Sequence, residues 1–268
     1  MNMKNIVALL LSIIVLGCQT KQKESIAIAE HKNQKPNIIY ILADDLGYGD
    51  VQSFNPVGKI PTPNLNDMSS NGAKFTDAYT SSSVCTPTRY SILTGRYNWR
   101  TELKSFVVSG YSKSLIKQER TTVAEMLKTQ GYHTAFIGKW HLGWDWEITK
   151  EDEKFSRDKL NARPEVDFSK PITNGPNSHG FDYTFGFCGS LDMAPYVYIE
   201  NNQPTMVPTK TTVSVDEKGV WREGVTSDDF NHATVLQDLT DKAVHYIAEN
   251  ANGEAPFFLY FPLPAPHT

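Results

Sequence analysis

The chain has 268 residues, of which 40% are hydrophobic and 21% charged, a globular composition that excludes a disordered, collagen-like or coiled-coil protein. Its formal net charge of -4 argues against a nucleic-acid-binding protein, which needs a basic face. Three cysteines are too few for a disulfide scaffold, and a chain of this length can bury a core large enough to fold without one.

The first 17 residues have the pattern of an export signal. Lys4 precedes an apolar run over residues 6–16, which is too short to span a bilayer because a spanning helix takes about 20 residues. The run ends in Leu16-Gly17-Cys18, and a small residue followed by cysteine at this point resembles a bacterial lipoprotein box, in which the cysteine is acylated and becomes the first residue. A plain signal peptide with an incidental cysteine is the alternative.

Residues 18–35 are mostly polar and contain no aromatic side chain, which predicts a flexible tether. Together with lipidation of Cys18, this predicts an exported bacterial lipoprotein, periplasmic or on the cell surface. Its contact with the membrane would be through the lipid anchor only.

From residue 36 onward the pattern alternates between strand and helix. A continuous apolar run over residues 37–43 predicts a parallel strand that is buried on both faces. Short patterns then predict a helix over residues 63–72, a strand over 73–79 and a helical turn over 88–93.

The clearest boundary signals surround residues 122–130. Thr122 and Glu125 fit a capping box, and Gly131 occupies the position that favours a left-handed residue after a helix. A helix is therefore expected here, with a strand over residues 134–137 directly after it.

The remaining patterns are a long insertion, a helix and a strand. Residues 144–178 are charged and proline-containing, which indicates an insertion over one face. Apolar side chains at helical spacing predict an amphipathic helix over residues 234–250, and residues 257–261 predict another buried strand. Alternation of this kind indicates an α/β sandwich with a mostly parallel central sheet.

Two adjacent carboxylates, Asp44 and Asp45, directly follow the first strand. Ligands of open α/β sheets bind at the carboxyl ends of the strands, and two neighbouring carboxylates repel each other unless a cation lies between them. Their hard oxygen atoms suit Ca²⁺ or Mg²⁺. A solvated turn is the alternative for this pair taken alone.

Cys85 stands just before a predicted helix start, and Arg89 follows one helical turn later. Helix N-termini favour anions and lower the pKa of a thiol. Because Arg89 is one helical turn from Cys85, both side chains are expected to face one site. The alternatives are a small buried cysteine or, in an oxidising compartment, a disulfide to Cys188.

Lys139 and His141 follow another predicted strand. Side chains two residues apart on an extended chain point to the same side. A cation and a proton-transfer group aimed together suit an anionic substrate.

Together these elements resemble the type I sulfatases of the alkaline-phosphatase-like superfamily. The main similarity is Cys-x-Pro-x-Arg followed by Leu-Thr-Gly over residues 85–95, and the second is Gly-Tyr-His-Thr-Ala-Phe-Ile-Gly-Lys-Trp-His-Leu-Gly over residues 131–143. Shorter similar stretches occur in the expected order at residues 36–50, 63–65 and 179–182. The resemblance covers residues 36–268 and implies the N-terminal part of a sulfatase catalytic domain, an α/β/α sandwich incomplete at the C-terminus.

In the sulfatases a maturation enzyme oxidises the motif cysteine to Cα-formylglycine. The resemblance therefore implies that Cys85 is catalytic and does not pair with Cys188. A hydrated aldehyde carries two hydroxyls on one carbon: one attacks sulfur and displaces the alcohol, and the other then loses its proton and expels sulfate. A serine would be left as a sulfate ester that needs attack by water.

The resemblance also implies a metal site. Asp44 and Asp45, together with the modified Cys85, would bind Ca²⁺ or Mg²⁺, which polarises a sulfate oxygen. Arg89 would steady the nucleophile and these carboxylates.

Three further residues take roles by the same resemblance. Lys139 would contact the sulfate and the leaving oxygen, and His141 would hold the second hydroxyl and help to remove its proton. His267 lies in a stretch similar to the loop that carries the family's second active-site histidine, so it would protonate the leaving alcohol or bind the sulfate.

The sequence departs from the family pattern in one place. The family has an Asp-Asn or similar pair of metal ligands and a further lysine after the second histidine, and this sequence contains no Asp-Asn, Asp-Gln or Asp-His dipeptide. We therefore expect a truncated member that binds Ca²⁺ weakly, because strong sites use six to eight oxygen atoms, and that has low or no activity alone. The strand at residues 257–261 would lack neighbours and expose an apolar edge.

Three functions are compatible with these residues. The first is hydrolysis of sulfate esters on sulfated glycans, with galactose or N-acetylgalactosamine units favoured because residues 190–200 are similar to stretches of glycan sulfatases. The second is a phosphate or phosphonate ester hydrolase of the same superfamily. The third is a non-catalytic glycan-binding lipoprotein, in which Cys85 stays unmodified. Expected partners are the sulfated carbohydrate and the formylglycine-generating enzyme.

Several other residues are expected to have structural or surface positions. These are His133, His179, His232 and His245. Trp144 and Trp146 open the charged insertion, where their indole rings would stack on sugars or pack in the core.

Overall fold

The structure, a computed structural model, describes residues 35–152, 162–216 and 219–267. The described fold belongs to one compact unit, Pro36–Thr268. The predicted signal and lipidation site, Cys18 included, and all of the predicted tether except Lys35 lie outside the described residues. Within the described ranges, no helix is long and apolar enough to cross a membrane.

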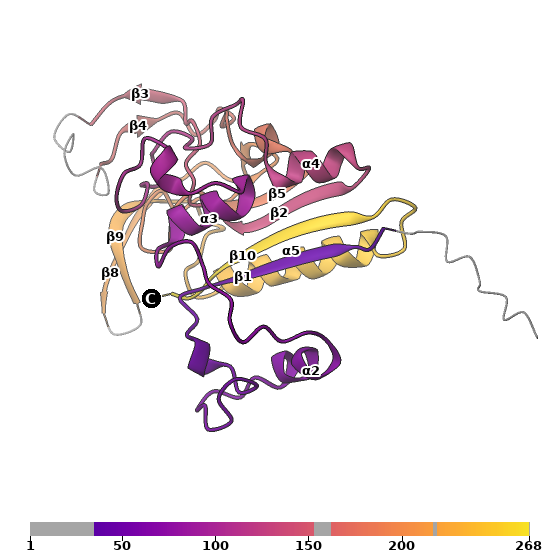
Figure 1. Cartoon of the computed structure of the whole chain (residues 1–268). Helices are drawn as coiled ribbons and strands as arrows, with labels where there is room; N and C mark the ends of the chain where they lie inside the picture. The colour runs from indigo at the N-terminus through magenta and orange to yellow at the C-terminus, as the bar shows by residue number, and fades with distance from the viewer. Residues whose placement is uncertain (1–34, 153–161, 217–218, 268) are drawn as a thin grey trace, which may run out of the picture. The chain divides into compact units, whose positions relative to one another are not determined.

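A six-stranded sheet forms the centre of the fold (Figure 1). Four parallel strands come first in its spatial order, and two short antiparallel strands extend it. In that order the strands are β1 (Ile38–Asp44), β10 (Phe257–Pro266), β2 (His133–Lys139), β5 (Tyr183–Phe187), β6 (Ile199–Glu200) and β7 (Gln203–Pro204). The mostly parallel sheet confirms the predicted α/β class.

Helices cover both faces of the sheet (Figure 1). On one face lie α3 (Cys85–Thr94) and α4 (Val123–Thr129), and on the other lies α5 (Val235–Asn250). Alternate residues of β10 supply the two cores: Phe258 and Tyr260 pack towards α3 and α4, whereas Phe257, Leu259 and Phe261 pack towards α5. This two-sided burial explains why the strand is apolar without a break.

The capped helix at residues 122–130 is confirmed as α4. The Thr122 hydroxyl accepts a hydrogen bond from the Glu125 backbone N–H, and the Glu125 carboxylate accepts one from Thr122. Gly131 follows with a φ of 82°, the left-handed conformation that favours glycine.

Several predicted boundaries differ in the structure, and β10 runs to Pro266 instead of ending at residue 261. α3 begins at Cys85 rather than at residue 88. Pro87 is the third residue of the helix, where a backbone N–H would have no partner within the helix, so the proline costs no hydrogen bond. The helix predicted at 63–72 is α2 (Pro63–Asn71), but the strand predicted over residues 73–79 is wrong. That stretch is irregular and exposed, with no strand beside it in the described chain to accept its backbone hydrogen bonds.

Several short elements were not predicted from the sequence. β3 (Ile148–Lys150) and β4 (Glu165–Val166) pair inside the charged insertion. β8 (Lys210–Asp216) and β9 (Gly219–Thr226) form a separate hairpin. The 3-10 turns are η1 (Tyr48–Asp50), η2 (Asn98–Arg100) and η5 (Pro176–His179).

Trp144 and Trp146 were expected either to stack on sugars or to pack in the core, and the structure shows core packing. Their exposed fractions are 1% and 7%, and both belong to the core beneath α3 and α4. Their rings lie edge to face with centroids 5.5 Å apart, so neither indole face is open to a sugar.

β1 is an open edge of the sheet, whereas the strand at residues 257–261, which was predicted to expose an edge, is interior. β10 lies between β1 and β2, whereas β1 pairs only with β10 among the described residues. Ile39 and Ile41 are therefore 43% and 55% exposed, although the sequence of β1 is as apolar as that of an interior strand.

Replacing Ile41 with lysine is expected to raise the monomeric fraction of the purified chain. A charge on an exposed edge strand opposes edge-to-edge pairing between copies. Size-exclusion chromatography with light scattering over a concentration series measures the effect. Val244→Lys on α5, at a position that is 60% exposed, adds the same charge away from the edge. An equal gain in both variants would assign the effect to net charge and not to β1.

Candidate active site

The carboxyl ends of two parallel strands and the start of one helix meet at one place. Asp44 is the last residue of β1, Lys139 is the last residue of β2, and Cys85 is the first residue of α3. Parallel strands of one sheet end on the same side, where open α/β folds bind their ligands. The structure thus brings together three elements that are far apart in the sequence.

An ion pair between Lys139 and Asp44 forms the centre of this cluster. The Lys139 Nζ atom lies 2.5 Å from Asp44 Oδ2, and both side chains are buried. Burial alone would raise the pKa of Asp44, but the Lys139 and Arg89 cations outweigh it and hold that pKa below its ordinary value. Asp44 is therefore a carboxylate in the folded protein.

Arg89 joins α3 to both strands, as its position one helical turn after Cys85 predicted. Its Nη1 donates to the carbonyl oxygen of Lys139 over 2.6 Å, and its Nη2 lies 3.4 Å from Asp44 Oδ1. The side chain is 1% exposed. Such a buried guanidinium holds the helix start in a fixed position relative to the strand ends.

Cys85 does not have the activated thiol that a helix N-terminus predicts. Burial raises the pKa of the Cys85 thiol by more than the Lys139 and Arg89 cations lower it. The protonated sulfur lies 3.5 Å from Asp44 Oδ1 and 3.4 Å from Lys139 Nζ. Cys85 and Cys188 are both free cysteines, so the alternative of a disulfide between them is wrong.

His141 is buried as a neutral base. Its Nε2 lies 3.0 Å from the Val108 carbonyl oxygen, which can only accept, so the proton is on Nε2. Its Nδ1 has no partner among the described residues. Burial lowers the pKa of His141 well below its ordinary value, and the Lys139 and Arg89 cations lower it further.

Lys139 and His141 do not lie two apart on an extended chain, as was predicted. β2 ends at Lys139, and His141 takes a φ of 51°, so the chain between the two residues is not extended. Both residues lie in the same region, but an extended backbone does not set the direction of their side chains.

β10 brings His267 to the carboxylates. The His267 backbone N–H donates to the Asp44 carbonyl oxygen over 2.9 Å, and its Nε2 lies 3.8 Å from Asp45 Oδ2. Asp45 takes a φ of 63°, and its carboxylate is 58% exposed. This geometry follows from the register of β1 and β10, in which Asp44 is paired with Pro266.

This group of side chains fits a divalent cation in the type of its donors. One ligand atom each from Asp44, Cys85 and His267 lie within 4.8 Å of one another, and the Asp45 carboxylate is adjacent. Carboxylate oxygen atoms suit Ca²⁺ and Mg²⁺. A pocket of about 290 Å³ opens beside them and is lined by both aspartates, Cys85 and Arg89.

Ser190 is a residue of the cluster that the sequence analysis missed. Its hydroxyl lies 2.9 Å from Lys139 Nζ and is buried. It follows β5, the next parallel strand of the sheet, so the rule that pointed to Asp44 would also have pointed to Ser190 if β5 had been predicted.

The other four histidines of the described ranges lie outside this cluster. His133 is exposed at the start of β2, and His245 pairs with Glu249 on the surface of α5. His179 is buried with its Nε2 3.3 Å from the Ser114 hydroxyl, and His232 stacks on Trp221.

The stability of the protein is expected to fall as the pH drops below about 6.5, the ordinary pKa of histidine. The lowered pKa of His141 means that the unfolded chain binds a proton there which the folded chain does not, so acid favours unfolding. Burial lowers the pKa of His179 and His232 in the same direction. His141→Gln is expected to reduce the slope of unfolding free energy against pH by up to about 1.4 kcal/mol per pH unit in urea denaturation series between pH 5 and 7.5. An unchanged slope would contradict a neutral, buried His141.

Comparison with known proteins relates the chain to one family. A family model described as Sulfatase matches residues 36–268. The chain is 32% identical to an N-acetylgalactosamine-6-O-sulfatase of Bacteroides thetaiotaomicron, over 97% of this chain and 53% of that protein. It is also 32% identical to arylsulfatase A of Bos taurus, over 84% of this chain and 40% of that protein.

Solved structures give the same relation. One, described under metabolism of multiple glycosaminoglycans by Bacteroides thetaiotaomicron, aligns with a TM-score of 0.70 and 31% identity over 88% of this chain and 52% of that chain. Another, solved in complex with k-i-k-neocarrahexaose, aligns with a TM-score of 0.59 and 26% identity over 88% of this chain and 46% of that chain. The chain spans about half the length of the curated relatives it matches.

Proposed function

The chain belongs to the sulfatase family, and on that premise we propose that it carries the catalytic centre of a hydrolase that cleaves sulfate esters of glycans. One observation carries the proposal. A buried lysine and a buried arginine converge with a carboxylate on position 85, at the carboxyl ends of parallel strands. Two fixed cations at this position suit a substrate and a transition state that carry negative charge.

Cys85 is proposed to be converted to Cα-formylglycine by the formylglycine-generating enzyme. The raised pKa of its thiol supports this, because a protonated thiol is a poor nucleophile in its own right. When formed, formylglycine supplies a hydrated aldehyde with two hydroxyls on one carbon, one for attack on sulfur and one for release of sulfate.

Lys139 and Arg89 are proposed to stabilise the charge of the reacting sulfate. Lys139 Nζ lies 3.4 Å from the Cys85 sulfur, close enough to contact a group that is bound to position 85. Its contacts with Asp44 and the Ser190 hydroxyl fix its direction, so the charge is in place before the substrate binds.

His141 and His267 are proposed to move the protons. The Nδ1 lone pair of neutral His141 can accept a proton from a hydroxyl at position 85, while the Nε2–H bond to Val108 holds the ring. His267, beside the exposed Asp45 carboxylate, is proposed to protonate the leaving alcohol or to bind the sulfate.

A divalent cation, Ca²⁺ or Mg²⁺, is proposed to be held by Asp44 and Asp45 next to position 85. When bound, it polarises a sulfate oxygen and favours the deprotonated nucleophile. The oxygen donors and the adjacent pocket support this assignment.

The proposed substrate is a sulfated glycan. A relative named N-acetylgalactosamine-6-O-sulfatase and a related structure solved with k-i-k-neocarrahexaose support this class, and the name of the former favours galactose-type units. The proposed organisation is a signal over residues 1–17, a tether over 18–35 and the N-terminal part of the catalytic domain over 36–268.

The chain is also proposed to be an exported bacterial lipoprotein, held at the membrane by acylated Cys18. Labelled palmitate supplied to expressing bacteria is expected to be incorporated into the protein, and Cys18→Ala is expected to abolish incorporation. Label that persists in the variant would exclude lipidation at this position.

Turnover of the sulfate and phosphate esters of one fluorogenic phenol tests the proposed function. The chain is produced together with a formylglycine-generating enzyme, and release of the phenol is followed for both esters. Faster release from the sulfate ester is expected. Faster release from the phosphate ester would favour the phosphate or phosphonate hydrolase. Glycan binding by a chain with unmodified Cys85 and no turnover would favour the non-catalytic lipoprotein.

A further inference from the structure

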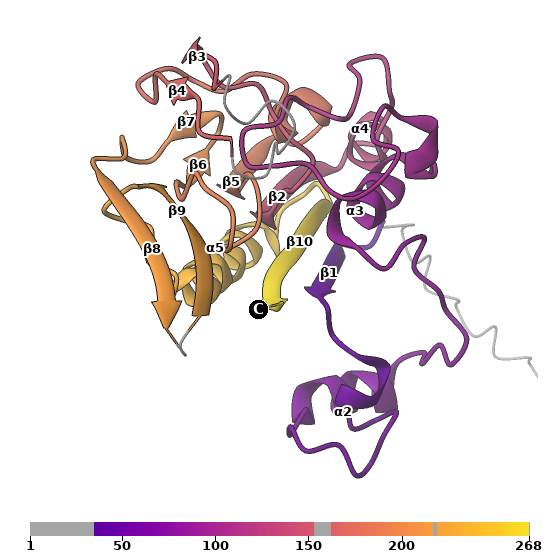
Figure 2. The ribbon, with the colours of Figure 1, turned by 90° about the vertical axis from the view of Figure 1, so that its left-hand side faces the viewer.

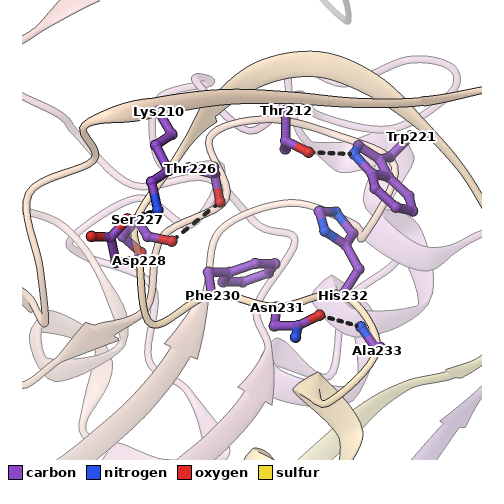
Figure 3. A pocket seen from close by; sticks show the side chains of 10 residues that line it. All are labelled: Lys210, Thr212, Trp221, Thr226, Ser227, Asp228, Phe230, Asn231, His232 and Ala233. Carbon is purple, nitrogen blue, oxygen red and sulfur yellow. Dashed lines mark hydrogen bonds and ion pairs between the residues drawn. The ribbon is translucent and has the colours of Figure 1, made fainter.

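A second pocket lies outside the catalytic cluster. It has a volume of about 460 Å³ and opens between the β8–β9 hairpin and residues 226–233, which lead into α5 (Figure 3). Its wall combines aromatic and polar side chains, among them Lys210, Thr212, Trp221, Asp228, Asn231 and His232. In Figure 2 the hairpin lies on the same side of the molecule as the carboxyl ends of β1 and β10.

Arg222, which is next to the lining residue Trp221, and the lining residue His232 attach this pocket to the active-site segment. The Arg222 backbone N–H and Nη1 both donate to the Asp192 carbonyl oxygen, over 3.2 and 3.1 Å, and the guanidinium also pairs with the Asp192 carboxylate. His232 Nε2 donates to the Leu191 carbonyl oxygen over 3.0 Å. These acceptors directly follow Ser190, whose hydroxyl contacts Lys139 in the cluster. Residues 190–192 therefore connect the wall of the pocket to the active site.

The wall of the pocket is rigid and aromatic on one side. The Trp221 and His232 rings are stacked, with centroids 4.0 Å apart and planes 10° apart. The Trp221 Nε1–H donates to the Thr212 hydroxyl over 3.3 Å, which fixes the indole on the hairpin. Aromatic groups held in this way suit the C–H groups of a sugar ring.

The opposite side is polar but carries no net charge. Lys210 Nζ lies 2.7 Å from Asp228 Oδ1, so each compensates the charge of the other. Burial lowers the pKa of His232, which favours a neutral ring. The Asn231 side-chain oxygen accepts from the Ala233 backbone N–H, and the side chain lines the pocket. Paired donors and acceptors without net charge suit sugar hydroxyls better than a second sulfate group.

We propose that this pocket is a glycan subsite, which binds the uncharged sugar ring next to the ring that carries the scissile sulfate. The inference rests on the proposed function, because only a glycan substrate would have a second ring to bind. It predicts that affinity depends on the length of the glycan and on Trp221.

Calorimetric binding to a variant that cannot turn over substrate, Cys85→Ala, tests the subsite. One probe is N-acetylgalactosamine 6-sulfate, and the others are trisaccharides in which two unsulfated galactose units extend it at either end. At least one trisaccharide is expected to bind about tenfold or more tighter than the monosaccharide. Adding Trp221→Ala is expected to remove that gain and leave monosaccharide binding unchanged.

Val220→Ala is the matched control, since Val220 neighbours Trp221 on β9, points to the other face and is 74% exposed. It is expected to leave both affinities unchanged. Lys210→Met, on the polar wall, is expected to weaken binding of the trisaccharide only. This variant tests the subsite if Trp221→Ala does not fold. Equal affinity for all probes, or equal weakening of all by Trp221→Ala, overturns the subsite alone. Failure of every probe to bind overturns the proposed function together with the subsite.

Discussion

Cys85→Ser is expected to abolish the steady-state hydrolysis of a sulfate ester, which is itself expected to be low in this chain alone, because loss of a nucleophile lowers covalent catalysis by about 1000-fold or more. Serine offers a single hydroxyl at the position where the mechanism needs two. A sulfate group transferred to that hydroxyl stays on it as a stable ester, since no second hydroxyl on the same carbon can expel it. The variant is therefore expected to react once and then to stop.

The measurement has two parts. Initial rates with an aryl sulfate follow the loss of turnover, and the intact mass of the reacted variant detects the trapped sulfate. Cys188→Ala serves as the control, because Cys188 is a buried core cysteine outside the cluster. This variant is expected to keep the activity of the parent chain. Full activity of Cys85→Ser, or equal loss in both variants, would contradict the role assigned to position 85.

Lys139→Met is expected to lower the free energy of unfolding by about 3–5 kcal/mol, the range found when one partner of a buried ion pair is removed. Lys139 is 0% exposed and Asp44 is 5% exposed, so the Asp44 carboxylate would stay buried with Arg89 as its remaining cation. Urea denaturation at pH 7.5 measures the change. At that pH the lowered pKa of Asp44 keeps its carboxylate charged in the folded parent protein, which is the reference for the variant.

The same substitution in an exposed pair is the control. Lys128 pairs with Asp182 on the surface, where their side chains are 53% and 41% exposed, and Lys128→Met is expected to change the free energy by at most about 1 kcal/mol. Adding Asp44→Asn to Lys139→Met is expected to recover part of the loss, because the unpaired carboxylate is then gone. A loss at Lys139 no greater than that at Lys128 would show that the buried pair does not hold the strand ends together.

The strand ends were predictable where the strands are apolar without a break. Residues 37–43 have that pattern, and residues 134–137 were predicted as a strand directly after the capped helix, so Asp44 and Lys139 could be found as candidate site residues at strand ends. β5 contains Thr184 and Gly186 between its aromatic residues, so it lacks a continuous apolar run, and Ser190 beyond it was missed. The glycine is needed because a Cβ there would lie 2.0 Å from the Gly138 carbonyl oxygen of β2, a contact that sequence does not reveal.

Properties that depend on distant segments were not predictable from local pattern. The thiol pKa of Cys85 follows from its burial and from Lys139, 54 positions away, rather than from the helix start alone. The open edge was assigned to the wrong strand because order along the chain does not give order across a sheet. β10 is last in sequence, yet it lies between β1 and β2.

The most direct test of the account measures the modification and the reaction on the same preparations. Chain produced with graded amounts of formylglycine-generating enzyme is digested, and mass spectrometry of the peptide that contains residue 85 gives the fraction converted to the aldehyde. Sulfate release from an aryl sulfate is measured in parallel. We predict that sulfate release rises in proportion to the converted fraction and is absent where Cys85 remains a thiol. Sulfate release that does not depend on the converted fraction would contradict a formylglycine-dependent sulfatase.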